Sequence, residues 1–568
     1  MKKLVCLLFV LSVSCCASAL DRQAFTFTKY DLNVRVEPEQ ERLGVRGKIT
    51  LRNDSNSPQR EITLQISSSL HWSAIQFQGK PVEYVTQPYI SDIDHTGALS
   101  EAIVVLPQAV APKQSIELEI GYEGVIPLDP SRLTRIGVPE ESAKHTDWDQ
   151  ISKTFTAVRG IGYVTWYPIA TDAASLADNS TSQAVDDWDR REGKAEMNAN
   201  MCVLNASTSP TLLMNDIPAE IPAMSAGGTN DSSLSCTSHY FPQLGLVPPL
   251  FVIGNYSILT NSIADIRFLS DHKPGADDYS SAIDEVSPLL TKWIGDHRKN
   301  SQQKANVVDL LDSQSAPYDA GNMLLIPLTG PDTKFLLAAA QQLTHLFFPS
   351  SHAWIHDGLA NYIQARFIEE KEGRQAAMRY MQAHRSAVVH SEKLVGAKHN
   401  GTPLINASHE TLAQTKAMFV WWMLRDIVGD RALQNALFNY KERDDSNPDY
   451  MQKLIQTQSH SDLQWFFDDW VYHDRGLPDF RIDSVFSSAL PSGGYMVTVS
   501  VENLGDAGAG IPVILNMQDG EKSDRLIVHG KSKASIRIEA PSWPQSVTVS
   551  DGSVPETDMS NNEYKVNH

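Results

Sequence analysis

The spacing of apolar residues changes twice along the chain. From Thr26 to about Tyr256, apolar and polar residues alternate, as in "DLNVRVEP" and "SIELEIGYEG", and Gly, Pro, Asn or Asp bounds each run. This period of two is typical of antiparallel strands with one buried face. From about Ser281 apolar residues recur at helical spacing, as in "DTKFLLAAAQQLTHLFF". After Pro478 alternation returns in "YMVTVSVENLG" and "SVTVSDG". The pattern therefore predicts sheet, then helices, then sheet.

We accordingly predict a multidomain α+β protein. Residues 20–258 are expected to form an N-terminal antiparallel β domain, residues 259–478 a mostly helical middle domain, and residues 479–568 a C-terminal β-sandwich. We expect residues 341–348 and 354–368 both to be helical. The 568 residues are 42% hydrophobic and 20% charged, which excludes disordered and collagen-like classes and suits several globular domains.

The N-terminus has the pattern of an export signal. "MKKLVCLLFVLSVSCCASAL" joins two lysines, an apolar run and a small-residue "ASA" that ends at Ala19. We predict a cleaved signal peptide over residues 1–19 and an exported protein, periplasmic or extracellular. Lipoprotein anchoring at Cys15 is the less favoured alternative, because Ser12 stands where such signals prefer leucine. No later stretch approaches the ~20 apolar residues of a transmembrane segment.

Charge and cysteine content restrict the partners and the redox state. The formal charge of −20 becomes two units more negative when Lys2 and Lys3 are removed, so nucleic acid is not an expected partner. Outside the signal only Cys202 and Cys236 remain. In an oxidising compartment these two are expected to form one disulfide with Cα atoms within about 7 Å. Two buried free thiols remain the alternative.

Several stretches, taken in order, resemble one family. "GKITLRN", "VTWYP", "FVIGNYSI", "GNMLL", "QQLTH", "WIHDGLANY" and "KAMFVWWMLRDIVGD" resemble the gluzincin metallopeptidases of the alanyl aminopeptidase and leukotriene A4 hydrolase family. The resemblance covers nearly the whole chain after the signal, up to Phe480. It implies a thermolysin-like fold for the middle domain. In the family, a His-Glu-x-x-His helix and a glutamate on the next helix bind Zn²⁺.

The resemblance also implies a degenerate catalytic site. Gln341 stands at the first histidine position, Gln342 at the general-base position, and only His345 is retained. On the next helix the family's Glu-Gly pair appears as Asp357-Gly358. A glutamine amide is a poor zinc ligand and cannot accept the proton of an attacking water. His345, Asp357 and Gln341 are therefore predicted to be vestigial metal positions, and Gln342 a vestigial catalytic one.

Two further family positions are changed as well. The exopeptidase motif Gly-x-Met-Glu-Asn aligns with Gly321, Met323 and Leu324, so that a leucine stands where a glutamate would hold the substrate's amino terminus. The oxyanion-stabilising tyrosine aligns with Gln414. Both roles require a well-placed anion or donor. We therefore predict that substrate binding by residues 321, 323 and 324 is vestigial too.

Two alternatives remain open for the metal. The favoured one makes His345 a hydrogen-bonded helix histidine and leaves the protein without a cofactor. With only His345 and Asp357 as competent ligands, bound zinc should then be substoichiometric. The rival is a zinc site rebuilt from His345, His352, His356 and Asp357. Against it, His352 precedes the helix, and the neighbours His356 and Asp357 point about 100° apart.

The sequence thus supports three hypotheses for function. The first is a catalytically inactive, exported aminopeptidase-like protein that binds a peptide or protein in an inter-domain cleft. The second is a divergent zinc metallopeptidase that uses the rebuilt site. The third is a structural envelope component without a ligand. Zinc content separates the first two, and peptide binding separates the first from the third. The tryptophans Trp354, Trp421 and Trp422 are interpreted as core residues.

Overall fold

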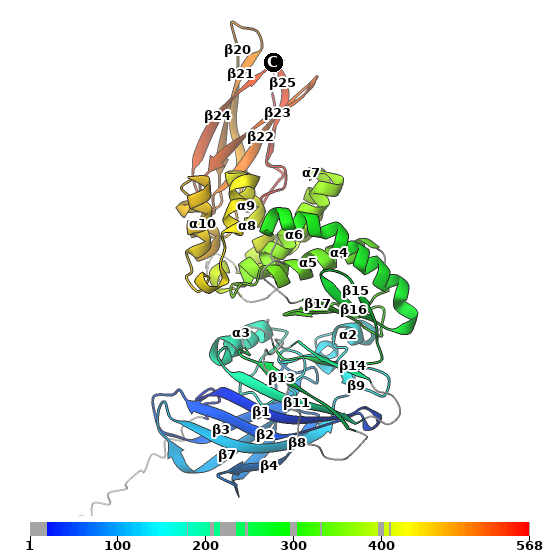
Figure 1. The fold of residues 1–568 in the computed structure, drawn as a ribbon. Helices are drawn as coiled ribbons and strands as arrows, with labels where there is room; N and C mark the ends of the chain where they lie inside the picture. The colour runs from blue at the N-terminus through cyan, green and yellow to red at the C-terminus, as the bar shows by residue number, and fades with distance from the viewer. Residues whose placement is uncertain are drawn as a thin grey trace, which may run out of the picture.

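A computed structural model describes residues 20–566 except 179, 205–209, 216–233, 245–247, 296–303, 330–331, 396–402 and 408–410. The predicted signal peptide, with Cys15, lies outside the described residues. Figure 1 shows three parts in a row, with the N-terminal sheets at one end, the helical part in the middle and the C-terminal strands at the other end. The predicted α+β class with its three-part architecture is confirmed.

The N-terminal domain is built on a seven-stranded sheet. Its order is β13-β11-β1-β2-β8-β4-β5, and a second sheet of three strands has the order β3-β7-β6. The strand bounds are β1 (Phe25–Glu37), β2 (Arg42–Asn53), β3 (Gln59–Ser67), β4 (Leu70–Phe77), β5 (Lys80–Pro81), β6 (Glu83–Ile90), β7 (Ala98–Val110), β8 (Ser115–Val125), β11 (Glu196–Leu204) and β13 (Leu234–Phe241). The alternation predicted one buried face for each strand, and in β1 every second residue from Tyr30 to Val36 is indeed buried: Tyr30, Leu32, Val34 and Val36.

Two features of this domain differ from the antiparallel β expectation. β1 and β11 pair in parallel, which their long separation in the sequence allows. The domain also contains the helices α1 (Ser131–Arg135), α2 (Glu140–Thr146) and α3 (Ser180–Glu192). In α3 only Thr181, Trp188 and Glu192 are buried, so its sequence shows little of the apolar periodicity that indicates a helix.

The two cysteines expected to pair face each other across the β11–β13 ladder. Cys202 and Cys236 are opposite residues in the register of the two strands. They form a disulfide, with Cα atoms 4.1 Å apart. The cross-link joins the edge strand β13 to its neighbour, so the alternative of two free thiols does not hold in this structure.

The middle domain begins with a five-stranded mixed sheet. Its order is β15-β16-β17-β19-β18, with bounds β15 (Ser257–Thr260), β16 (Ala264–Phe268), β17 (Ala305–Asp309), β18 (Tyr318–Ala320) and β19 (Met323–Ile326). The helices are α4 (Lys273–Ile294), α5 (Asp332–Phe347), α6 (Ala353–Glu372), α7 (Arg374–Val395), α8 (Thr411–Val428), α9 (Asp430–Phe438), α10 (Tyr450–Ser459) and α11 (Gln464–Phe467). The two segments expected to be helical thus belong to α5 and α6, except that α5 ends one residue early, at Phe347.

Close packing of α6 on α8 fixes the start of α6. A Cβ atom added at Gly358 would lie 2.5 Å from the Cβ of Ala417, so this position has no room for a side chain. The rings of Trp354 and Trp421 are stacked with centroids 5.2 Å apart, and the Trp421 indole donates to the backbone carbonyl of Trp354. Trp354, Trp421 and Trp422 are all buried, which confirms them as core residues.

The C-terminal strands form two facing sheets. Their orders are β20-β21-β24 and β23-β22-β25-β26, with bounds β20 (Phe480–Ala489), β21 (Tyr495–Asn503), β22 (Ala509–Met517), β23 (Gly520–Val528), β24 (Lys533–Ala540), β25 (Pro544–Val549) and β26 (Glu563–Lys565). One continuous hydrophobic core joins them to the middle domain. Arg374 of α7 adds a polar link, because its guanidinium pairs with both Asp426 and Asp551.

A second junction places the N-terminal domain against the sheet of the middle domain. A short sheet in the order β12-β14-β10-β9 lies on the N-terminal side, with bounds β9 (Gln150–Ile151), β10 (Thr156–Val158), β12 (Thr211–Met214) and β14 (Phe251–Gly254). Trp148 packs in one hydrophobic cluster with Met323 and Leu325 of β19, and its indole donates to the carbonyl of Ala316. Beside it, Tyr163 contacts Tyr318 of β18 edge to face.

A buried ion pair supports this junction from the N-terminal side. The Arg159 guanidinium forms a two-pronged contact with the Asp149 carboxylate, which also accepts the backbone N–H of Arg159. The same guanidinium lies over the rings of Tyr163 and Trp148, at 3.5 and 3.9 Å from their centroids. The edge strand β18 is thus held against an ordered polar-aromatic layer.

Among the described residues, no helix combines the length and apolar character that crossing a membrane requires.

Candidate metal centre

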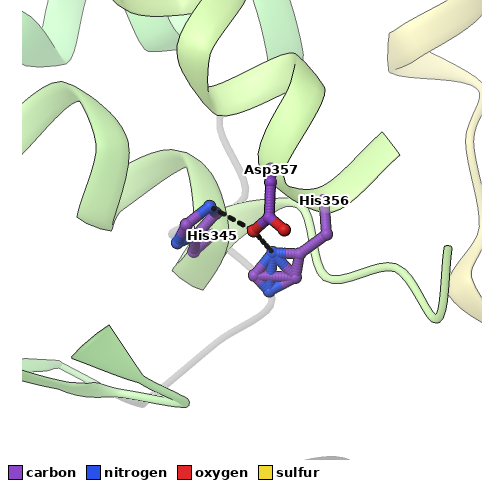
Figure 2. Close-up of side chains that lie close together, drawn as sticks. All are labelled: His345, His356 and Asp357. Atoms are coloured by element: carbon purple, nitrogen blue, oxygen red, sulfur yellow. Dashed lines mark ion pairs between the residues drawn. The ribbon is translucent and has the colours of Figure 1, made fainter. Parts of the chain in front are cut away.

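Three side chains with metal-binding atoms converge where α5 meets the start of α6. His345 Nε2 lies 3.4 Å from Asp357 Oδ1, and His356 Nδ1 lies 3.7 Å from the same oxygen. The two imidazole rings are 4.1 Å apart between centroids. One donor atom from each residue falls within 4.8 Å of the others. Figure 2 shows both imidazoles directed at the Asp357 carboxylate.

The positions of these residues follow from the two helices. His345 lies in the last turn of α5, whereas His356 and Asp357 are the fourth and fifth residues of α6. The argument that neighbours about 100° apart could not share one site is wrong for His356. The contacting atom of His356 is Nδ1, which is bonded to Cγ just as Oδ1 of Asp357 is. The two side chains approach each other by rotation about their Cα–Cβ and Cβ–Cγ bonds, which the helix angle alone does not describe.

Asp319 joins the cluster from the sheet, and no sequence motif indicated that it would. Its carboxylate forms a short hydrogen bond with Nδ1 of His345. Burial raises the pKa of Asp319, but attraction to His345 and this hydrogen bond outweigh the effect, so the pKa lies below its usual value. Asp319 belongs to no motif and is reached only because β18 pairs with β19, where it stands opposite Leu324.

His352 is not part of the cluster. It immediately precedes α6, and its Nε2 donates a hydrogen bond of 3.0 Å to the backbone carbonyl of Asp445. The four-residue rebuilt site is therefore corrected to three converging residues. The reason is that His352 stands outside the helix, where its ring is held by the loop that contains Asp445.

The two glutamines of α5 are engaged elsewhere. Gln342 is 2% exposed, and its amide oxygen accepts a hydrogen bond of 2.9 Å from the Tyr279 hydroxyl of α4. The amide oxygen of Gln341 accepts a hydrogen bond of 3.3 Å from Gln364 of α6. At the position that the sequence resemblance assigns to the general base, the structure thus holds a neutral amide fixed by a phenol. Such an amide cannot take a proton from water.

Of the remaining sequence-predicted positions, Gln414 contacts the cluster, whereas Gly321, Met323 and Leu324 lie in or beside strand β19. Gln414 of α8 donates to Asp357 Oδ2 at 3.2 Å. Leu324 and its neighbour Met323 are buried in β19. Gly321 has a φ of 61°, a left-handed conformation that suits glycine in the turn between β18 and β19. At the position where the sequence resemblance expects a glutamate that binds an amino terminus, the strand thus has a buried leucine.

The three converging residues fit a divalent metal. Zinc sites use nitrogen and oxygen ligands at about 2.0–2.2 Å in tetrahedral geometry, which places ligand atoms roughly 3.3–3.6 Å apart. The distances of 3.4 and 3.7 Å from Asp357 Oδ1 to the nitrogens of the two imidazoles are close to this separation of ligand atoms. His345 also has the carboxylate partner at its other nitrogen that metal-bound histidines usually have.

No family model and no curated protein matches the chain. Among solved structures, aminopeptidase A of Legionella pneumophila, crystallised in complex with aspartic acid, matches with a TM-score of 0.60 and 11% identity over 95% of this chain. The chain spans 60% of the length of that protein. At this identity the likeness shows the fold alone, and that fold is aminopeptidase-like.

Two further structures are of an M1 zinc metallopeptidase from Deinococcus radiodurans. A mutant of that enzyme gives a TM-score of 0.48 at 15% identity, over 80% of this chain and 96% of the other. The second structure of the enzyme gives 0.45 at 14% identity, over 77% and 91%. The aminopeptidase-like fold that the sequence resemblance implied is confirmed by the Legionella structure.

Proposed function

We propose that this chain is an exported aminopeptidase-like protein that has lost peptide hydrolysis and binds a peptide or another protein beside the junction of its N-terminal and middle domains. The observation that carries the proposal is Gln342. It stands at the position of the general base, is buried, and accepts a hydrogen bond from Tyr279. A neutral amide held in this way has no means of removing a proton from water.

Two other requirements of hydrolysis are also unmet. The tetrahedral intermediate needs a donor for its oxyanion, and Gln414 directs its amide N–H groups at Asp357. An exopeptidase must hold the free amino terminus of its substrate, and Leu324 is buried and apolar. Loss of the base alone costs about 10²–10⁴-fold in rate. We therefore assign no peptidase activity to the site.

The location of the cluster supports binding rather than a purely structural role. Asp319 belongs to β18, and its neighbour Tyr318 contacts Tyr163 of the N-terminal domain. The His345 cluster thus lies one residue along the strand from the domain junction. The Legionella aminopeptidase of the same fold holds aspartic acid in its crystal structure. By analogy, the ligand class we propose for this chain is a peptide or a protein terminus.

A divergent zinc metallopeptidase is the second candidate, and one observation favours it: His345, His356 and Asp357 converge. A metal bound there would acidify a water molecule, as in other zinc enzymes. The described part of the chain offers no carboxylate at the position of Gln342 to take the proton. We therefore rank this candidate below the non-catalytic protein.

The binding proposal predicts that short peptides with a free amino terminus bind reversibly and are recovered intact. Isothermal calorimetry should detect saturable binding to the full chain, and mass spectrometry should find the peptide uncleaved. Asp357→Ala should weaken binding by about 10–100-fold, since a buried hydrogen bond to a charged group is worth roughly 1.5–3 kcal/mol.

The matched control is His352→Ala, which alters a nearby histidine outside the cluster and should leave peptide affinity unchanged. Absence of binding across a varied peptide panel would favour the structural envelope component. Recovery of cleaved peptide would favour the metallopeptidase.

A further inference from the structure

We propose that His345, His356 and Asp357 form a three-ligand site for a divalent transition metal, with zinc the best fit, and that Asp319 is its positioning residue. The ligand set differs from that implied by the sequence resemblance. Gln341, at the first histidine position of the motif, takes no part, and His356 from the next helix supplies the second imidazole. The site goes beyond the proposed peptide binding, because it concerns the metal alone.

The donor geometry is the first support. Asp357 Oδ1 lies between two imidazole nitrogens, at 3.4 Å from His345 Nε2 and 3.7 Å from His356 Nδ1. These separations are close to the edges of a zinc tetrahedron. Two imidazoles and one carboxylate are also the ligand types that zinc prefers, and three protein ligands leave one position open.

The setting of His345 is the second support. It is 8% exposed at the end of α5, so its ring has little freedom. Because Nδ1 is engaged by Asp319 on β18, Nε2 is the nitrogen directed at Asp357. A carboxylate on the far nitrogen fixes the tautomer and the ring orientation of a metal-bound histidine. Asp319 therefore acts on the metal through His345 and does not contact it.

The anchoring of α6 is the third support. Gly358 allows α6 to lie against Ala417 of α8 without a gap, and Trp421 donates to the carbonyl of Trp354 one turn before Asp357. The N-terminal part of α6, which carries two of the three ligands, is therefore fixed before any metal arrives. A preorganised site loses little free energy on binding. The count of two competent ligands made from the sequence omitted His356, whose place only the structure gives.

A bound metal would offer one electrophilic position to a ligand, while the protein would still lack a base at Gln342. The predicted chemistry is therefore binding of an electron-pair donor, such as a carboxylate or an amine, without hydrolysis.

The test is metal titration of the full chain after chelator treatment and dialysis, with no peptide present. Zinc calorimetry should give one equivalent per chain, and Co²⁺ should give the visible absorption of a tetrahedral site. His345→Ala, His356→Ala and Asp357→Asn should each weaken zinc binding by about 100-fold or more, since even outer partners contribute 10–100-fold. Asp319→Asn should weaken it by about 10–100-fold while keeping the tetrahedral Co²⁺ spectrum.

His352→Ala is the matched control, because this histidine contacts Asp445 and not the cluster; it should bind zinc as the unmodified chain does. Circular dichroism of the metal-free variants establishes that each is folded, and His356, which is partly exposed, is the substitution least able to disturb folding. Titration without a saturable equivalent would overturn the proposal, as would unchanged affinity in His356→Ala. Neither result bears on the loss of peptidase activity, which is measured separately.

Discussion

Replacing both glutamines of α5, in the double variant Gln341→His and Gln342→Glu, is expected to tighten zinc binding by about 100-fold or more without creating an efficient peptidase. Position 341 lies one helical turn before His345, on the same face of α5. A histidine there adds an imidazole to the metal ligands, and such a change should exceed the 10–100-fold effects of outer partners. Zinc calorimetry of the variant against the unmodified chain measures the gain.

Activity should lag behind metal binding in the same variant. Gln414 would still stand in place of the oxyanion donor, a loss worth about 10²–10³ in kcat, and Leu324 would still leave a substrate amino terminus without an anion. Adding Gln414→Tyr should raise turnover further, whereas Gln341→His alone should raise only zinc affinity. Full aminopeptidase turnover from the double variant alone would show that we have overestimated the importance of Gln414 and Leu324.

The Asp149→Ala variant is expected to destabilise the N-terminal domain by about 3–5 kcal/mol, because it leaves Arg159 as an unpaired buried charge. The side chain of Arg159 is 2% exposed and that of Asp149 is fully buried. The carboxylate also accepts a hydrogen bond from the backbone N–H of residue 159, so its removal leaves this second buried polar group without its acceptor. Urea unfolding, followed by hydrogen exchange in peptides from the N-terminal domain, measures the loss.

Glu117→Ala provides the control for that measurement. Glu117 pairs with Lys48 on the surface at 2.8 Å, with both side chains about half exposed, and exposed pairs contribute about 0–1 kcal/mol. A loss of less than about 1 kcal/mol for Asp149→Ala would mean that Arg159 is solvated on removal of its partner. The polar-aromatic layer would then not support the domain junction.

Periodicity predicted the order of the three parts because the buried residues of a strand recur every two positions, whereas those of a helix recur every three to four. It missed α3, whose few buried residues, Trp188 among them, give no amphipathic stripe. Periodicity also could not predict the parallel pairing of β1 with β11. Alternation indicates which face of a strand is buried, but it does not indicate which strand lies beside it. Long-range pairing depends on the whole chain.

The candidate site was predictable only where its residues lie in a motif. Asp357 and Gln414 were placed by their neighbours in sequence, and the structure brings them into hydrogen-bond contact. His356 was set aside by an argument about helix angles that neglected rotation about the side-chain bonds. Asp319 was missed because its contact with His345 depends on how β18 packs against α5. That packing brings together residues 26 positions apart, and no local sequence pattern indicates it.

The central claim is that this aminopeptidase fold has lost its reaction, and the release of free amino acid from amino-acid amides and short peptides tests it most directly. The unmodified chain would be assayed with chelator and with one equivalent of Zn²⁺. We predict a rate equal to that of the buffer with the same zinc, because Gln342 cannot act as the base. Zinc-dependent, chelator-sensitive cleavage that disappears in His345→Ala would contradict the account.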